Sequence, residues 1–197
     1  MNTDRKLFIY PRNKNVLQYT LRLSPLILSH QGNRNLPDKI HLTVATVVKR
    51  EDLFLMVREI RNDLGEAFDG TTDRGKAKEV YNQPSGHVEA GETPIQAAVR
   101  ETFEETRWHV EPTGIISFTT YTSPNNHITY YRLTFAAKAL EFDETTEIDS
   151  DIEEALWLSY EEILLKRSQL RSPIVLQVID DFRANSIYSL DLLKAHR

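Results

Sequence analysis

Residues 93–106 are the segment that most restricts how this chain can fold, because three signals together mark the start of a helix. Thr93 is a favoured N-cap residue, Pro94 suits the first helical position, and Gln96 completes a capping box with Thr93. The smaller and apolar side chains of the segment then share one side of the helix, namely Ile95, Ala98, Val99, Thr102 and Thr106. The pattern predicts a helix over residues 93–106 whose apolar side packs on a core.

The same helix carries three carboxylates on a neighbouring arc, Glu101, Glu104 and Glu105. Like charges at these spacings destabilise a helix by about 0.2–0.5 kcal/mol per pair, and negative charge is also unfavourable near a helix C-terminus. Only Arg100 offers local compensation. The cluster is either a solvated acidic face or a site for a hard divalent cation such as Mg²⁺ or Mn²⁺, which prefers oxygen ligands.

Composition describes a single globular domain. The chain has 197 residues, which suffices for one core, and it contains no cysteine, which excludes disulfides, thiolate metal sites and a cysteine nucleophile. No stretch approaches the roughly 18 apolar residues of a membrane helix, and the first residues lack the apolar run of a signal peptide. We therefore expect a soluble cytoplasmic protein with no membrane partner.

The net charge of -5 is unevenly distributed. Residues 1–40 carry seven Lys and Arg against two acids, whereas residues 41–197 carry 17 against 27. An acidic body argues against nucleic acid as a partner, because such binding relies on basic residues that neutralise phosphates. If this chain binds phosphates, we expect it to do so through metal ions.

Strand patterns dominate the middle of the chain. Residues 40–57 read as a β-hairpin with a turn at Glu51 and Asp52, and residues 114–121 and 128–140 read as strands joined by a turn at 123–126. Residues 58–80 are polar and rich in glycine, so a long surface loop is predicted there.

Helices follow after an acidic connection. Residues 141–154 contain eight acids and no Lys or Arg, which indicates a solvated or metal-facing segment. A short strand is predicted at 155–159, a helix opened by a capping box of Ser159 and Glu162 comes next, and Ser172 and Pro173 begin another helix.

Residues 86–108 resemble the Nudix box. Its pattern is Gly, five residues, Glu, seven residues, Arg-Glu, an aliphatic residue, any residue, Glu-Glu, any residue, Gly and a final aliphatic residue. Six positions match in register, namely Gly86, Glu92, Arg100, Glu101, Glu104 and Glu105, and Trp108 stands at the last apolar position. Thr102 replaces an aliphatic residue, and Arg107 replaces the closing glycine, which costs about 1–2 kcal/mol if that position needs a positive φ.

The resemblance extends beyond the box. The runs HLTVATVV, YNQPSGHVEAGET, LWLSYEEIL and LRSP are similar to the NudJ group of Nudix phosphatases, which act on nucleoside di- and triphosphates and on the pyrimidine diphosphate precursor of thiamine. It implies an α/β fold, the Nudix-type α/β/α sandwich with a mixed β-sheet. The expected organisation is an N-terminal extension at 1–38, a Nudix hydrolase domain at 39–185 and a C-terminal tail at 186–197.

The resemblance also implies roles for the matched residues. The metal ligands would be Gly86, through its carbonyl, with Glu101, Glu104 and Glu105, and the cation would be Mg²⁺ or alternatively Mn²⁺. Glu101 would bind metal or act as general base, Arg100 would orient it, and Glu92 would brace the loop. Family members often use one more acid outside the box, for which the candidates are Glu144, Glu147, Asp149, Asp151 and Glu153.

Substrate recognition is expected from aromatic or basic residues that flank the box. His87, Tyr81, Tyr130 and Arg132 are candidates to stack on a base or hold a phosphate, although the two tyrosines fit equally well as half-buried strand residues. His41 and His109 lie outside any recognisable constellation.

These observations favour Mg²⁺-dependent hydrolysis of phosphoanhydride bonds in nucleotides and related small diphosphates. Two alternatives stay open: a catalytically silent nucleotide-binding module, with Arg107 as its damaged position, and an RNA 5′-end pyrophosphohydrolase that uses the basic first forty residues. The sequence does not distinguish a monomer from a homodimer, nor release of phosphate from release of pyrophosphate.

Overall fold

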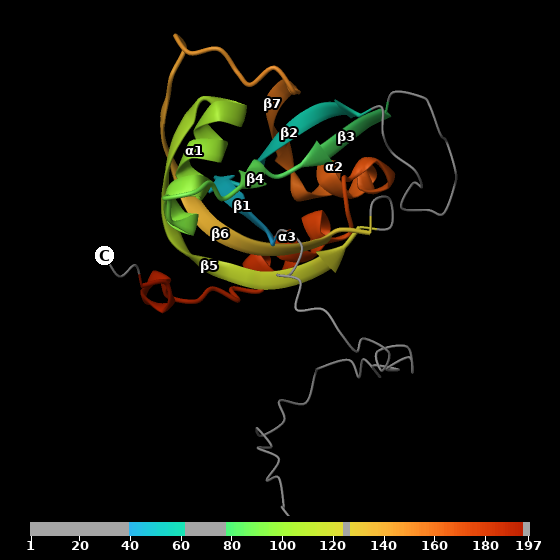
Figure 1. Ribbon diagram of the computed structural model, residues 1–197. Coiled ribbons are helices and arrows are strands. Elements are labelled where there is room, and N and C mark those ends of the chain that lie inside the picture. The colour runs from blue at the N-terminus through green and yellow to red at the C-terminus, as the bar shows by residue number, and fades with distance from the viewer. Residues whose placement is uncertain (1–39, 62–77, 124–126, 195–197) are drawn as a thin grey trace, which may run out of the picture. The chain divides into compact units, whose positions relative to one another are not determined.

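The computed structural model describes residues 40–61, 78–123 and 127–194. The strands of this part are β1 (His41–Arg50), β2 (Leu53–Arg61), β3 (Lys78–Asn82), β4 (Ser85–His87), β5 (Trp108–Thr122), β6 (Thr129–Phe142) and β7 (Ile152–Ser159). The α-helices are α1 (Pro94–Thr106), α2 (Tyr160–Leu165) and α3 (Ile174–Arg183) (Figure 1).

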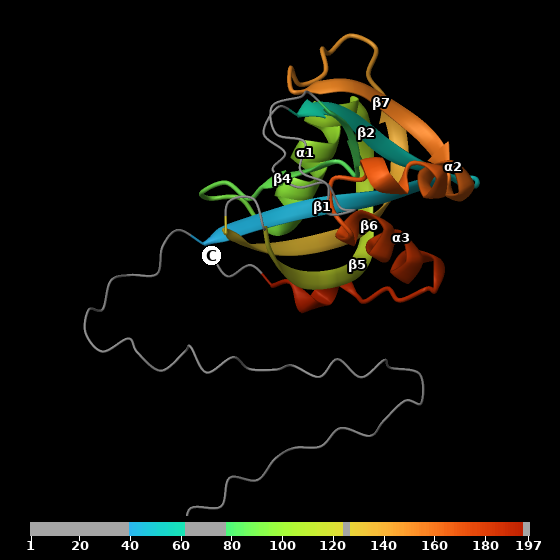
Figure 2. The ribbon, with the colours of Figure 1, turned by 90° about the vertical axis from the view of Figure 1, so that its right-hand side faces the viewer.

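The strands form one mixed sheet in the order β3-β2-β1-β6-β5, with β4 paired to β1 and β7 paired to β2. β1 and β6 run parallel along nearly the whole length of β1, and the other pairs are antiparallel. Figure 2 shows β1 crossing the middle of the molecule, with β6 and β5 beside it. The α/β fold class with a mixed sheet is therefore confirmed.

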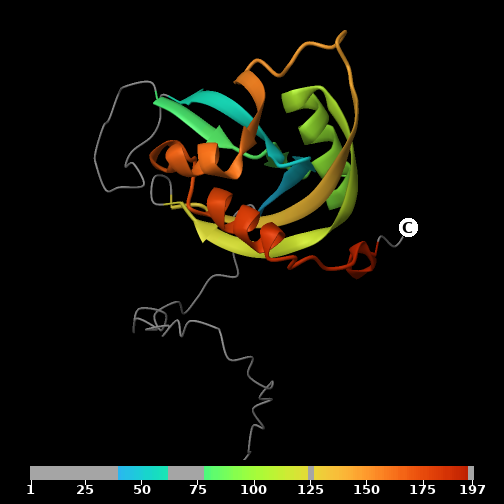
Figure 3. The same ribbon diagram turned by 180° about the vertical axis from the view of Figure 1, so that it is seen from behind.

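Helices cover both faces of the sheet, because side chains of β1 alternate between two cores. Val44 packs with Ala98 of α1, while Val47 on the opposite face packs with Val175 and Ile179 of α3. The hydroxyl of Thr46, on the α1 face, donates a hydrogen bond to the Ala98 carbonyl (3.4 Å). Figures 1 and 3, seen from opposite sides, both place α1 across the strands from α2 and α3.

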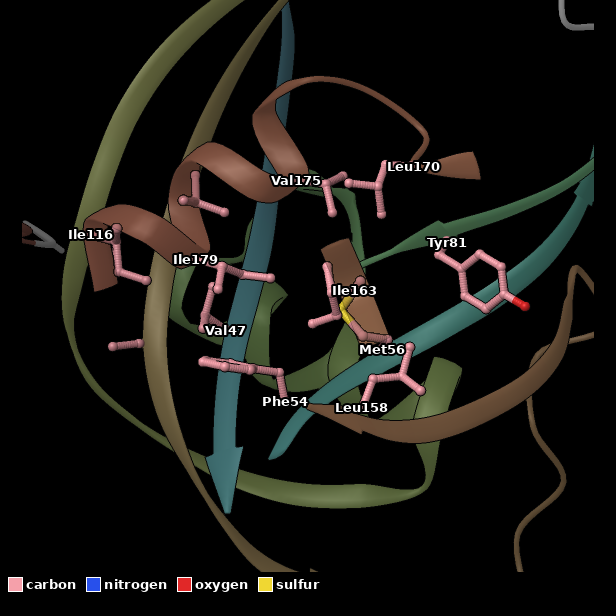
Figure 4. Packing of buried hydrophobic residues seen from close by; sticks show 12 residues of the cluster. Val47, Phe54, Met56, Tyr81, Ile116, Leu158, Ile163, Leu170, Val175 and Ile179 are labelled. Atoms are coloured by element: carbon pink, nitrogen blue, oxygen red, sulfur yellow. The ribbon is translucent and has the colours of Figure 1, made fainter. Parts of the chain in front are cut away.

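The larger core lies under α2 and α3. Met56 from β2 meets Ile163 from α2 and Val175 from α3, and these three side chains have no more than a trace of exposed surface (Figure 4). Burying a side chain of this size stabilises the fold by about 1.5–3 kcal/mol. These contacts fix α2 and α3, the helices that follow β7 in the chain, on the sheet.

The predicted loop at 58–80 is wrong at both ends. Arg58–Arg61 continue β2 and Lys78–Val80 begin β3, and the two stretches pair with each other. Their polar composition hid this pairing, because ladder hydrogen bonds are made by the backbone whatever the side chain. Residues 62–77 lie outside the described part of the chain.

Other boundaries are shifted. The hairpin of β1 and β2 is confirmed, and so is the capping box of Ser159 and Glu162 that opens α2. β5 begins at Trp108, six residues before the predicted strand, and it accommodates register shifts along its first half. α3 begins at Ile174 with Pro173 as its N-cap and no side-chain cap, one residue later than predicted. Most of the predicted turn at 123–126 lies outside the described residues.

Residues 186–194 lie against the edge strand β5. The N–H groups of Ile115 and Tyr188 each donate to the other residue's carbonyl at 2.8 Å, and Leu190 and Leu193 pack on the core beneath α1. The predicted division of the chain into extension, domain and tail stays a prediction. Within the described part, no helix is long and apolar enough to cross a membrane.

Candidate active site

Helix α1 begins as its sequence predicts. Thr93 is the N-cap, its hydroxyl accepts from the Gln96 N–H (3.3 Å), and the Gln96 side chain accepts from the Thr93 N–H (2.8 Å). Thr102 is fully buried, and its hydroxyl donates to the Ala98 carbonyl at 2.7 Å. The polar replacement at this aliphatic position is therefore satisfied within the helix and disturbs nothing around it.

The end of α1 is also regular. Arg107 adopts the left-handed conformation (φ 63°), and its N–H donates to the Phe103 carbonyl at 2.6 Å. Its guanidinium lies 4.8 Å from the centre of the Phe142 ring, a cation–π contact. Arg107 therefore ends the helix in the left-handed conformation that is more common for glycine at this place.

Arg100 connects the acids of the site. Its guanidinium donates to Glu92 (2.7 Å), to Glu101 (2.9 Å) and to Glu104 (2.9 Å), and also to the His87 carbonyl (3.0 Å). Hydrogen bonding to Glu92 is the largest of the effects that raise the pKa of Arg100 above its ordinary value. One side chain thus joins the loop before α1 to two carboxylates on α1.

Glu92 fixes the loop in front of the helix. Hydrogen bonding from Arg100 lowers the pKa of this carboxyl below its usual range, and a second hydrogen bond comes from the Glu89 N–H (2.7 Å). Both contacts favour the ionised form. The bracing role of Glu92 stays a prediction.

Glu101 lies directly against Gly86. A Cβ atom on Gly86 would stand 2.0 Å from the carboxyl carbon of Glu101, so only glycine leaves room for this side chain. Burial raises the pKa of Glu101, and the hydrogen bond from Arg100 opposes that rise. A carboxylate made more basic in this way suits a general base.

Glu105 is the most enclosed of the three acids. Its carboxylate accepts a hydrogen bond from the Ser85 N–H at 2.8 Å, which ties α1 to β4. Burial raises the pKa of Glu105 to about 8, and the negative charges of Glu59 and Glu101 add to that effect. The ionised carboxylate of Glu105 therefore has too little positive charge around it to balance its own, and a divalent cation would supply that charge.

The three helix acids do not form one chelating cluster. Glu104 is half exposed and contacts Arg100, as Glu101 does, while Glu105 faces β4. Among the described residues, no three His, Asp or Glu side chains stand together as a group that holds a metal ion. The donors are nevertheless hard oxygen ligands around the Gly86 cradle, which fits Mg²⁺ or Mn²⁺. The ligand set of Gly86, Glu101, Glu104 and Glu105 stays a prediction.

The acidic segment after β6 reaches the site. Asp151 and Glu153 line a cavity of about 420 Å³ together with Glu105. Asp149 anchors the segment, since its N–H donates to the Glu104 carbonyl at 2.9 Å. Glu144 does not line this cavity. Three of the five candidate acids outside the box thus lie beside a box residue, Asp151 and Glu153 through their side chains and Asp149 through its backbone.

His87 and Tyr130 form an aromatic group with a third residue. The His87 ring centre lies 6.3 Å from that of Tyr130, and the His41 ring lies 5.7 Å from His87 and 5.4 Å from Tyr130. The prediction that His41 lies outside any constellation is wrong, because β1 pairs in parallel with β6 and sets His41 opposite Tyr130. His109 also has a partner, since it stacks on Phe103 at 4.5 Å.

Tyr81 and Arg132 lie further inside. Tyr81 is buried in the larger core, and the Lys166 ammonium lies 4.4 Å from its ring centre and 3.2 Å from its hydroxyl. This placement supports the alternative that Tyr81 is a packed strand residue. Burial and the charge of Arg171 lower the pKa of Arg132 to about 10, while Glu105 and Glu59 oppose that shift.

Two residues near the site were not identified from the sequence, Glu59 on β2 and Arg171 before α3. Both line the cavity beside Glu105, and they form an ion pair at 2.6 Å. Glu59 was assigned to the predicted loop, and Arg171 was noted only within the run LRSP. Their separation of more than a hundred residues left no local signal for the pair.

Known proteins resemble this chain in sequence and in structure. The NUDIX domain family model matches residues 39–178. Phosphatase NudJ of Shigella boydii is 38% identical over 155 residues, covering 79% of this chain and 91% of that protein, and Phosphatase NudJ of Escherichia coli K12 is 37% identical over the same spans.

A solved structure agrees with these matches. The NUDIX hydrolase from Nitrosomonas europaea superimposes with a TM-score of 0.71 at 37% identity, covering 80% of this chain and 98% of that one. The family match spans most of the chain, from the start of β1 into α3, and includes every residue of the box. This chain therefore belongs to the Nudix hydrolase family, and its sequence is similar to the NudJ phosphatases.

Proposed function

We propose that this Nudix hydrolase cleaves phosphoanhydride bonds in nucleoside di- and triphosphates and related small diphosphates, with Mg²⁺ as its cofactor. The observation that carries the proposal is the group around Arg100, in which one guanidinium holds Glu92, Glu101 and Glu104 beside Gly86. The identity to NudJ phosphatases supports phosphate esters and anhydrides as the class of substrate, and the thiamine pyrimidine diphosphate precursor is a candidate within it.

Different residues of the site would bind the metal ion and accept the proton of the attacking water. Glu104 and Glu105, with the Gly86 carbonyl, would hold the ion, and Glu105 has the ionisable group that most needs a counter-charge. When bound, Mg²⁺ would neutralise charge on the phosphates and lower the pKa of the attacking water. Glu101 would accept the proton of that water, because burial raises its pKa toward neutrality.

Recognition of the remainder of the substrate is assigned to the group of His87, Tyr130 and Arg132. The two rings lie at the ends of β4 and β6, on either side of β1, where a planar base could stack on them. Arg132, two residues after Tyr130 on β6, would contact a phosphate. Tyr81 is left out of this assignment because the core encloses it.

The catalytically silent alternative is not favoured by the described residues. Its argument was the arginine at the box glycine, and Arg107 adopts the left-handed conformation that a helix-ending glycine commonly adopts. The acids of the box are all present, and Arg100 is hydrogen-bonded to Glu92, Glu101 and Glu104.

Replacing Glu104 and Glu105 with Gln tests the proposal. The charges that would hold Mg²⁺ are lost while shape is kept, so release of phosphate or pyrophosphate from nucleoside triphosphates should fall by at least about 100-fold. Glu141→Gln, at an exposed acid on β6, is the matched control and should retain full activity. Undiminished turnover by the double variant would contradict the proposal.

The same assay resolves the finer assignments. Measuring phosphate and pyrophosphate separately across nucleoside di- and triphosphates identifies which phosphorus is attacked. Repeating it with Mg²⁺ and with Mn²⁺ identifies the preferred cation. Circular dichroism of each variant checks that the fold is kept.

A further inference from the structure

The cavity beside Glu105 contains positive charge as well as acids. It measures about 420 Å³ and lies between the end of β2, the end of α1 and the start of β7. The charged residues of its walls are Glu59, Arg61, Glu105, Asp151, Glu153 and Arg171. A cavity that joins a predicted metal ligand to arginines is suited to a molecule that carries both phosphates and a bound cation.

Arg171 is held at this cavity from two directions. Its Nη1 group donates to both carboxylate oxygens of Glu59, at 2.8 and 2.6 Å, and Glu59 is only 5% exposed. Its backbone N–H donates to the Tyr81 carbonyl at 3.0 Å, which fixes the segment before α3 against β3. The guanidinium therefore has little freedom, and little entropy would be lost if it bound a ligand.

Most of the Arg171 guanidinium is still available for bonding. A guanidinium has five N–H donors, and the contacts to Glu59 use only those on Nη1. The Nε and Nη2 groups have no acceptor among the described residues, and about a third of the side chain (35%) is exposed. Glu59 is buried behind the Nη1 group, so its negative charge is shielded from the cavity. The edge of the guanidinium formed by Nε and Nη2, called the free edge below, is left to bind an anion.

The charge of Arg171 also acts on a second guanidinium, that of Arg132. Arg132 has no carboxylate hydrogen-bonded to it within the described residues, and burial, followed by the positive charge of Arg171, lowers its pKa. An anion bound to Arg171 would weaken this repulsion. Glu59 and Glu105 balance this charge without a direct contact to Arg132.

We propose that Arg171 is a substrate-binding residue of this enzyme, positioned by Glu59 so that its free guanidinium edge takes the phosphate oxygens of the diphosphate group. The inference rests on the proposed function, because it places those phosphates next to Glu105. The ligand class is an inorganic or organic diphosphate that arrives with its divalent cation.

Arg171→Ala should raise KM for a nucleoside diphosphate by about 10- to 100-fold, the factor expected when a charge-assisted hydrogen bond to phosphate is lost, with a much smaller change in kcat. Arg167→Ala is the matched control, because it removes the same charge four residues away at a side chain that does not line this cavity. Equal KM values for the two variants would overturn the proposal. Arg171→Lys keeps the positive charge but loses the planar, two-pronged set of donors, so its KM should lie between those of the wild type and Arg171→Ala.

A purely structural role for Arg171 predicts a different pattern. Arg171→Ala leaves Glu59 buried without a partner, which lowers stability by itself. The double variant Glu59→Gln with Arg171→Gln removes both charges and should regain thermal stability. Our proposal requires that its KM stays raised, and a return of KM to the wild-type value would overturn it.

Binding of magnesium pyrophosphate, measured by isothermal titration calorimetry, tests Arg171 without turnover. The dissociation constant should rise about 10- to 100-fold in Arg171→Ala and stay unchanged in Arg167→Ala. Equal affinity in these two variants would overturn the role of Arg171. Absence of Mg²⁺-dependent hydrolysis in the wild type would instead contradict the proposed function, so the two failures are distinguishable.

Discussion

Gly86 has a spatial role that its place in the box does not reveal. The sequence resemblance assigns its carbonyl to the metal, whereas the geometry adds that the Glu101 carboxyl occupies the space where a Cβ would be. The backbone of Gly86 has no positive φ, since among the described glycines only Gly91 does. The glycine is therefore required by close approach of a side chain.

Gly86→Ala should lower kcat/KM by about 100-fold, because the new methyl group displaces the Glu101 carboxylate by an ångström or more. Gly91→Ala is the control. Its Cβ would meet no atom within 4 Å, but its φ of +91° is strained for alanine, so it should cost about 1 kcal/mol of stability and spare turnover. Steady-state kinetics and thermal unfolding of both variants check this, and equal kinetics would refute the spatial role.

Single residues of the site were predictable where their signal is local. The spacing from Glu92 to Glu105 placed Arg100 among the acids of the box. In the structure its guanidinium makes four contacts, to three of these acids and to a carbonyl of the preceding loop. His41 was not predictable, because it reaches the site through strand pairing with residues far along the chain.

Helix α1 ends on a residue that is poorly suited to its backbone. Arg107 has a φ of 63°, a region that costs a non-glycine residue about 1–2 kcal/mol. Its guanidinium recovers part of that cost through the contact with the Phe142 ring at 4.8 Å. Side-chain packing and backbone strain therefore act in opposite directions at this position.

Two substitutions separate these effects. Arg107→Ala loses the ring contact and keeps the strain, whereas Arg107→Gly loses the contact and relieves the strain. Arg107→Gly should therefore be more stable than Arg107→Ala by about 1 kcal/mol in urea unfolding. Equal midpoints and slopes would show that the left-handed cap carries no measurable strain.

Helix starts were predicted better than strand ends. The capping boxes at Thr93 and Ser159 are local in sequence and appear as expected. The ends of β2, β3 and β5 depend on which strand lies beside them, so polar residues such as Arg58 and Lys78 join the sheet against their composition. α3 begins one residue late because Ser172 makes no cap.

At the scale of the whole molecule, the last described segment closes one edge of the sheet. Tyr188 pairs with Ile115 of β5, and the Ile187 side chain lies over Gly114, where a Cβ would stand 2.3 Å from it. The sequence predicted a C-terminal tail at residues 186–197. A segment that pairs through a few residues with a distant strand leaves no periodic signal.

Deleting residues 186–197 should lower the free energy of unfolding by about 3 kcal/mol, since two backbone hydrogen bonds and the apolar contacts of Leu190 and Leu193 are lost. Urea unfolding measures the change, and a chain that lacks only residues 195–197 is the control. A truncated protein as stable as the control would show that this segment contributes nothing to the fold.

The parallel ladder between β1 and β6 also governs how the molecule assembles. Its partners, such as Thr43 and Arg132, stand roughly 90 residues apart in the chain, so a large loop must close before they meet. During synthesis, β1 cannot form its parallel pairing with β6 until β6 has left the ribosome. A chain stopped before that point holds every residue of the Nudix box yet lacks the strand that orders the sheet beneath them, so we expect catalytic competence to arise late in folding.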